Sequence, residues 1–130
     1  MDTTWYSLSV SNKDVPTFMK RLPHGEVVDE HEAFTEIFWI DSALIDDLME
    51  MAKEGFVFSG CNGACAGCYG EHVFVAAEGQ FAACPAAYEY NRCPAVPVEA
   101  DGTIHPVRLK RAMEYWELFK KAYPNPLHSP

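Results

Sequence analysis

The stretch HVFVAAEGQFAAC, residues 72–84, predicts a β-hairpin. Apolar residues dominate residues 72–77 and 80–84, and only Glu78 and Gly79 connect the two runs. A two-residue connection that ends in glycine is typical of tight hairpins, because glycine readily adopts the positive φ that such a turn requires. We therefore expect two adjacent antiparallel strands in this part of the chain.

The residues before the hairpin predict three more strands and two helices. Alternating apolar residues favour a half-buried strand at 5–10, while aromatic and β-branched residues favour strands at 33–40 and 56–58. Apolar residues at helical spacing predict helices at 14–22 and 42–55, the second of which ends at a glycine.

The C-terminal part of the chain predicts one long helix that begins near Pro106 and ends before Pro124. Six residues at helical spacing are expected to face the core: Leu109, Ala112, Met113, Trp116, Phe119 and Tyr123. Tyr115 and Leu118 lie off this stripe and are candidates for an exposed contact patch. Residues 85–105 are rich in proline and turn residues, so we expect them to be irregular.

Length and composition predict a single domain over residues 1–130, with a loose tail at 125–130. Hydrophobic residues make up 48% of the chain, which is enough to form a globular core at this length. No apolar run approaches the roughly 20 residues that span a bilayer, and the first residues lack the features of a signal peptide. We expect an α+β fold in which a small, mostly antiparallel sheet is packed by two or three helices.

The most specific chemical feature is the set of five cysteines. Three of them lie in the run CNGACAGC, residues 61–68, and Cys84 and Cys93 follow, each directly before a proline. The odd number of cysteines favours a reducing, cytoplasmic setting with free or metal-bound thiols. Zinc is commonly held by four thiolates at the corners of a tetrahedron. We therefore expect a structural zinc, held by four of the five cysteines within residues 59–94.

The pair Cys65 and Cys68 resembles a zinc knuckle, in which a tight turn of small residues presents two sulfurs to one metal. The hairpin that follows resembles the arrangement of a zinc ribbon, with Cys84 as the third ligand and Cys93 as the fourth. A ribbon normally supplies its second pair as C-x2-C, whereas eight residues separate these two cysteines. The remaining cysteine, Cys61, is an alternative to either of them, and His72 is a candidate nitrogen ligand.

An iron–sulfur cluster is the alternative to zinc. Cys61, Cys65 and Cys68 have C-x3-C-x2-C spacing, and a cysteine followed by proline is typical of the last ligand in bacterial ferredoxins. The spacings across all five cysteines match neither the bacterial nor the plant ferredoxin pattern, so zinc is favoured.

The net charge of −9 disfavours direct binding of nucleic acid, because phosphates require lysine and arginine for neutralisation. The charge is also uneven: residues 106–130 carry +3, which leaves −12 for the rest of the chain. The run Asp-Glu-His-Glu at 29–32 is a candidate for binding a divalent cation or a basic protein, or is a solvated loop. An acidic surface of this kind favours a basic protein partner.

Together these features predict a non-catalytic, acidic protein-binding module of the inhibitor, immunity or antagonist type, stabilised by a structural zinc. Two alternatives stay open at this stage. One is an iron–sulfur or thiol redox protein that transfers electrons, which the density of cysteines favours. The other is a small zinc metalloenzyme, in which one coordination position of the metal is left to water.

Overall fold

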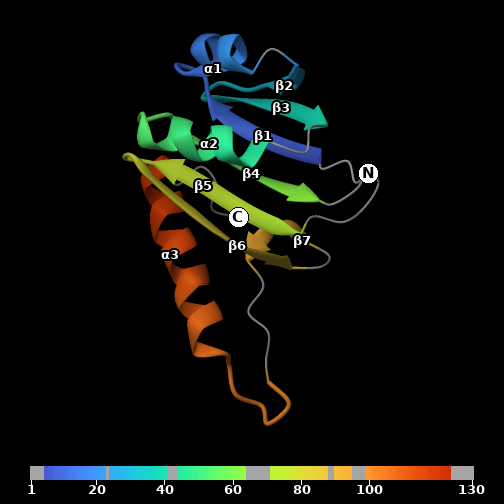
Figure 1. Cartoon of the computed structure of the whole chain (residues 1–130), viewed down its shortest axis with the longest axis vertical. Coiled ribbons are helices and arrows are strands. Elements are labelled where there is room, and N and C mark those ends of the chain that lie inside the picture. The colour runs from blue at the N-terminus through green and yellow to red at the C-terminus, as the bar shows by residue number, and fades with distance from the viewer. Residues whose placement is uncertain are drawn as a thin grey trace.

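The computed structural model describes residues 5–22, 24–40, 44–63, 71–87, 90–94 and 99–123. Within these residues it has a mainly antiparallel sheet and three helices, so the α+β prediction is confirmed (Figure 1). The elements are β1 Trp5–Ser11, α1 Val15–Arg21, β2 Glu26–Glu30, β3 Phe34–Ile40, α2 Leu44–Lys53, β4 Phe58–Gly63, β5 His72–Ala77, β6 Gln80–Ala87, β7 Tyr90–Pro94 and α3 Pro106–Ala122. No helix among the described residues is long and apolar enough to cross a membrane.

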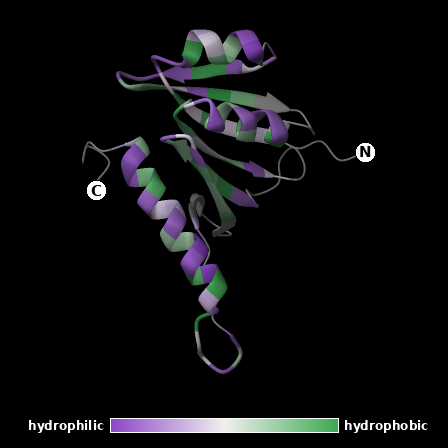
Figure 2. Ribbon diagram, turned by 60° about the vertical axis from the view of Figure 1, so that its left-hand side comes forward, coloured by the Kyte–Doolittle hydropathy of each residue, from purple (hydrophilic) through white to green (hydrophobic). Residues whose placement is uncertain are grey.

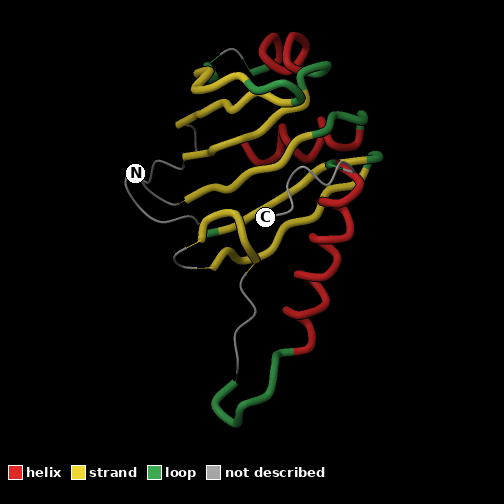
Figure 3. The backbone as a smooth tube through the Cα atoms, turned by 180° about the vertical axis from the view of Figure 1, so that it is seen from behind, coloured by secondary structure: helices red, strands yellow, loops and turns green. Residues whose placement is uncertain are grey.

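The strands form one sheet in the order β2-β3-β1-β4-β5-β6-β7, and every neighbouring pair is antiparallel (Figure 3). The first four strands and two helices follow each other as β-α-β-β-α-β, which is the order of the split β-α-β motif. The predicted hairpin then extends this unit beside β4, and the short strand β7 pairs only with the last residues of β6.

Helices cover both faces of the sheet, and each face therefore has its own core. Helices α1 and α2 lie on one face, over a cluster rich in aromatic residues: Tyr6, Leu8, Phe18, Leu48, Met51, Phe58 and Phe74 are among its buried members. Helix α3 lies on the other face, over Trp5, Cys61, Val73, Val75, Cys84, Tyr115 and Leu118. Because successive strand residues point to opposite faces, both sets of alternating residues are buried in β5, and both are apolar from Val73 to Ala77.

The predicted hairpin is present as β5 and β6. Glu78 and Gly79 connect the strands with φ values of 52° and 77°, and two positive φ values in a two-residue loop are characteristic of a type I′ turn. All residues of β5 except His72 are buried, because this strand lies between the two cores.

The face of α3 that packs on the sheet differs from the predicted one. Ala112 is buried and Phe119 is half-buried against the core under α3, as predicted, but Met113 and Trp116 are 59% and 40% exposed. Tyr115 and Leu118, which lie off the predicted stripe, are buried instead. Both sets are apolar and lie roughly a third of a turn apart around the helix, so spacing alone does not decide between them. The prediction of an exposed patch at Tyr115 and Leu118 was therefore wrong.

The rotation of α3 is fixed at its C-terminal end by Tyr123. The hydroxyl groups of Tyr123 and Ser59 share a hydrogen bond of 2.8 Å, and the Tyr123 hydroxyl donates to the Ser9 carbonyl over 3.2 Å. These contacts tie the end of the helix to β4 and β1.

Three strands differ from the sequence-based expectation. β2 was not predicted, because all five of its residues are exposed and it carries no alternating apolar pattern. β7 lies in the segment expected to be irregular. β4 begins at Phe58, where the strand predicted at 56–58 was expected to end, and runs to Gly63. Cys61 therefore lies inside a strand and not in a cysteine-rich loop.

Close packing of β4 against β1 explains a glycine in the middle of a buried strand. Gly60 pairs with Leu8, and a Cβ atom at Gly60 would clash with the backbone carbonyl oxygen of Ser7. Backbone atoms of a central strand cannot move aside as a flexible side chain can, so this position excludes a side chain.

We expect Gly60→Ala to lower the free energy of unfolding by about 1–3 kcal/mol, because overpacking displaces β4 from β1. Urea denaturation followed by circular dichroism measures the change. Asn62→Ala, two residues further along β4, is the matched control and should stay within about 0.5 kcal/mol of the parent protein. A Gly60→Ala protein as stable as the parent would show that the two strands are less tightly packed than described.

Candidate functional site

A cleft of about 1290 Å³ lies between α2 and α3. The N-terminal half of α3 extends beyond the sheet, as Figures 1 and 3 show, and apolar residues recur along its length (Figure 2). The apolar lining comes from three places: Ile45 and Met49 of α2, Leu109 and Met113 of α3, and Tyr6, Phe74, Phe81 and Ala83 of the sheet.

The edge of β6 supplies backbone hydrogen-bonding groups to this cleft. The Ala86 N–H donates to the Glu71 carbonyl over 2.9 Å. This bond shows which alternate residues of β6 form hydrogen bonds with β5. In an antiparallel pair these bonds involve every second residue, so the peptide groups of Phe81 and Ala83 point away from β5. Strand β7 pairs only with Ala86 and Ala87, and within the described chain no strand other than β5 pairs with the part of β6 before them.

Pro85 limits the length of this open edge. Proline has no N–H group, so the edge offers both donors and acceptors only between the hairpin turn and Pro85. The available edge is therefore short, and it runs beside the exposed apolar residues of α3.

The walls of the cleft differ in charge. Helix α3 contributes both signs, namely Lys110, Arg111, Lys121, Glu114 and Glu117. On α2, Asp46 and Glu50 are exposed. Both lie next to the cleft residue Met49 on the surface of the helix. Lys121 lies 3.8 Å from Glu78 of the hairpin turn, so this ion pair closes one end of the cleft. The carboxylates of α2 therefore lie beside the cleft and not in its lining, whereas the α3 wall carries both signs of charge.

The structure separates the two cysteines whose side chains it describes. Cys61 on β4 and Cys84 on β6 are both buried, and Val73 of β5 pairs with each of them. Strands two positions apart are about 9–10 Å from each other. Two thiolates bound to one zinc at about 2.3 Å must be within about 5 Å. In this sheet a single zinc can therefore be bound by at most one of Cys61 and Cys84.

The other predicted ligands are not located. Cys65 and Cys68 lie outside the described residues, and Cys93 lies in β7 without a described side chain. The zinc-knuckle-like loop and the choice between zinc and an iron–sulfur cluster therefore stay predictions. The separation of Cys61 and Cys84 makes Cys65, Cys68 and Cys93 the core of any such site, with one further ligand.

We expect Cys65→Ser and Cys68→Ser each to lower the zinc content of the purified protein and its melting temperature, because metal-binding energy contributes to folding. Elemental analysis and thermal denaturation measure the two effects. Unchanged zinc content and stability in both variants would exclude this pair as ligands.

Burial raises the pKa of the Cys84 thiol from its ordinary value of 9 to about 11, and nearby Arg111 only partly opposes this effect. At neutral pH the thiol therefore keeps its proton, whereas a metal ligand or nucleophile must be a thiolate. In this environment Cys84 is a core residue with low reactivity.

This pKa shift predicts a loss of stability in alkaline solution. Above about pH 9 the unfolded chain releases the Cys84 proton while the folded protein retains it, so the free energy of unfolding falls until about pH 11. Urea denaturation across this range should show a steeper decline for the parent protein than for Cys84→Ala. Parallel curves would show that the folded environment does not disfavour the thiolate.

Comparisons of the chain with protein-family models, with curated proteins and with solved structures find no match. The cleft residues on α3 and the open edge of β6 were not predicted as a site. Two features of the sequence relate to this site. Pro85 relates to the open edge of β6, and the second apolar face of the last helix relates to the cleft residues on α3.

Proposed function

We propose that this chain is a non-catalytic protein-binding module, and that its cleft takes an extended apolar segment of a partner protein. The observation that carries the proposal is the open edge of β6 beside the exposed apolar residues of α3. An unpaired strand edge next to a helix offers two kinds of recognition at once, because the backbone supplies affinity and the side chains supply specificity.

The incoming segment would add a strand to β6 through the peptide groups of Phe81 and Ala83. Side chains alternate along an extended segment. One set would therefore face Ile45 and Met49 on α2, and the other set would face Met113 on α3. Exposed methionines suit such a role, since their flexible, polarizable side chains adapt to different partners.

The charge distribution favours a partner with basic residues beside the apolar segment. Residues 1–105 carry −12, and the exposed carboxylates of Asp46 and Glu50 lie on the α2 side of the cleft. Complementary charge mainly accelerates association and selects the partner, while apolar contacts hold the complex together. Cys61 and Cys84 do not line the cleft, so binding there requires no thiol chemistry.

A displayed library of short peptides tests the proposal, because selection from random sequences does not require the partner to be identified first. We expect selected peptides to combine alternating apolar residues with flanking lysine or arginine. The Met113→Asp variant should weaken their binding by at least about tenfold, because a buried charge replaces an apolar contact. Val28→Asp, on the exposed strand β2 at the opposite edge of the sheet, is the matched control and should leave the affinity unchanged.

Methylation of backbone nitrogens in a selected peptide distinguishes strand addition from simple apolar contact. Strand addition predicts that methylation weakens binding at alternate positions only, since every second N–H group bonds to β6. Selection of no binder, or of binders that are insensitive to Met113→Asp, would contradict the proposal.

A further inference from the structure

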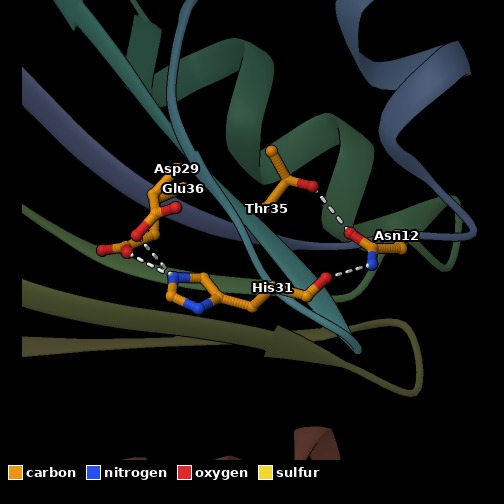
Figure 4. Close-up of polar contacts among 5 residues, drawn as sticks. All are labelled: Asn12, Asp29, His31, Thr35 and Glu36. Carbon is orange, nitrogen blue, oxygen red and sulfur yellow. Dashed lines mark hydrogen bonds and ion pairs between the residues drawn. The ribbon is translucent and has the colours of Figure 1, made fainter.

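Three potential metal ligands meet at the opposite edge of the sheet, on β2, β3 and the turn between them (Figure 4). His31 Nε2 lies 2.7 Å from Glu36 Oε2 and 3.5 Å from Asp29 Oδ2. All three ligand atoms lie within 4.8 Å of one another. The sequence run at 29–32 contains two of these residues, but the third comes from the neighbouring strand.

A β-bulge brings the two carboxylates together. The register between β2 and β3 shifts between Val27 and Asp29, so that Asp29 lies opposite Glu36. Without this shift Val28 would be opposite Glu36, and Asp29 would be opposite the buried residue Thr35 on the other face. Like charges directly across a strand pair are destabilising, so this arrangement favours a positive charge between the carboxylates.

The backbone of His31 is held in place from two sides. The His31 backbone N–H donates to the Phe34 carbonyl over 2.9 Å, and the Asn12 side-chain amide donates to the His31 carbonyl over 2.9 Å. Thr35 Oγ1 in turn donates to Asn12 Oδ1 over 2.6 Å. The His31 ring also stacks on the Phe34 ring, with centroids 4.6 Å apart and planes at 28°. The nitrogen ligand is therefore fixed without any contribution from a metal.

We propose that Asp29, His31 and Glu36 bind a divalent transition-metal ion. The imidazole distinguishes this set from an acidic patch, because imidazole nitrogen favours zinc, copper, iron and nickel over calcium and magnesium. The cation takes the place of the hydrogen bond between His31 and Glu36, and its two positive charges balance both carboxylates. Water completes the coordination, since Asp29 and His31 are exposed to solvent. This site is independent of the proposed function of the cleft.

Manganese is the best probe, because it favours the carboxylate ligands of this set and avoids the thiolates that would bind added zinc. We titrate Mn²⁺ into the ¹⁵N-labelled full chain and follow paramagnetic broadening of the backbone amide signals. Broadening should begin at residues 29–36 and should be reversed by excess Zn²⁺, which competes for the same ligands.

Glu36→Gln and His31→Ala should each weaken Mn²⁺ binding by at least about tenfold, because each removes one ligand. Glu36→Gln replaces the ion pair with His31 by a neutral hydrogen bond and also removes the repulsion from Asp29, so the metal-free variant should be nearly as stable as the parent in urea. This second measurement separates loss of a ligand from loss of the fold.

Glu32→Gln is the matched control, since it removes the same charge from an exposed residue of the same turn that is not a ligand. It should leave the affinity almost unchanged. Equal weakening by Glu32→Gln and Glu36→Gln would show that Mn²⁺ is attracted only by diffuse negative charge, and would overturn the proposal. So would a titration in which residues 29–36 are not broadened first, as expected if a proton alone bridges His31 and Glu36.

Discussion

Burial of both faces of the central strands is the constraint on which this structure depends. Strand β5 is buried along residues 73–77, and its alternate side chains enter the aromatic core under α1 and α2 or the core under α3. A sheet with one wet face would tolerate polar residues at every second position of β5, whereas here both sets of alternate residues at 73–77 are apolar. The position of α3 follows, since an uncovered second face would expose Val73, Val75 and Cys84 to water.

Helix α3 is longer than the face that it covers, and this mismatch creates the cleft. Its C-terminal half is tied to the sheet by packing of Tyr115 and Leu118 and by the hydrogen bonds of Tyr123. Its N-terminal half passes the edge of β6, where residues 106–111 are all exposed. The anchored half provides a rigid base, so the projecting half can hold a fixed distance from the strand edge. Rigid positioning of this kind lowers the entropic cost of binding a partner.

The sequence predicts those parts of the fold that depend on local signals. The hairpin at 72–84, the strand at 5–10 and the long final helix each carry their own turn, alternation or periodicity. The strand β2 could not be predicted in this way, because its pairing with β3 is decided by tertiary contacts and neither of its faces is buried. The rotation of α3 about its axis could not be predicted either. The helix has two apolar faces, and packing against the sheet determines which of them is buried.

The candidate sites also depend on contacts between strands, which local sequence signals do not reveal. Cysteine spacing indicates a metal site, yet it cannot show that β5 lies between Cys61 and Cys84 and keeps them apart. The meeting of Glu36 with Asp29 depends on a bulge, and a register shift of one residue is not visible in a single sequence. Sites assembled from adjacent strands are therefore the part of the function that a linear pattern describes least well.

Pro85 has a consequence for the behaviour of the protein at high concentration. Open strand edges are templates for uncontrolled pairing between molecules, which leads to aggregation. By removing a donor within β6, Pro85 prevents a long ladder from forming there, and β7 covers the residues that follow. The other edge, β2, is protected by its acidic side chains and its bulge. The sheet thus has one short open edge, while both of its ends resist growth into fibrils.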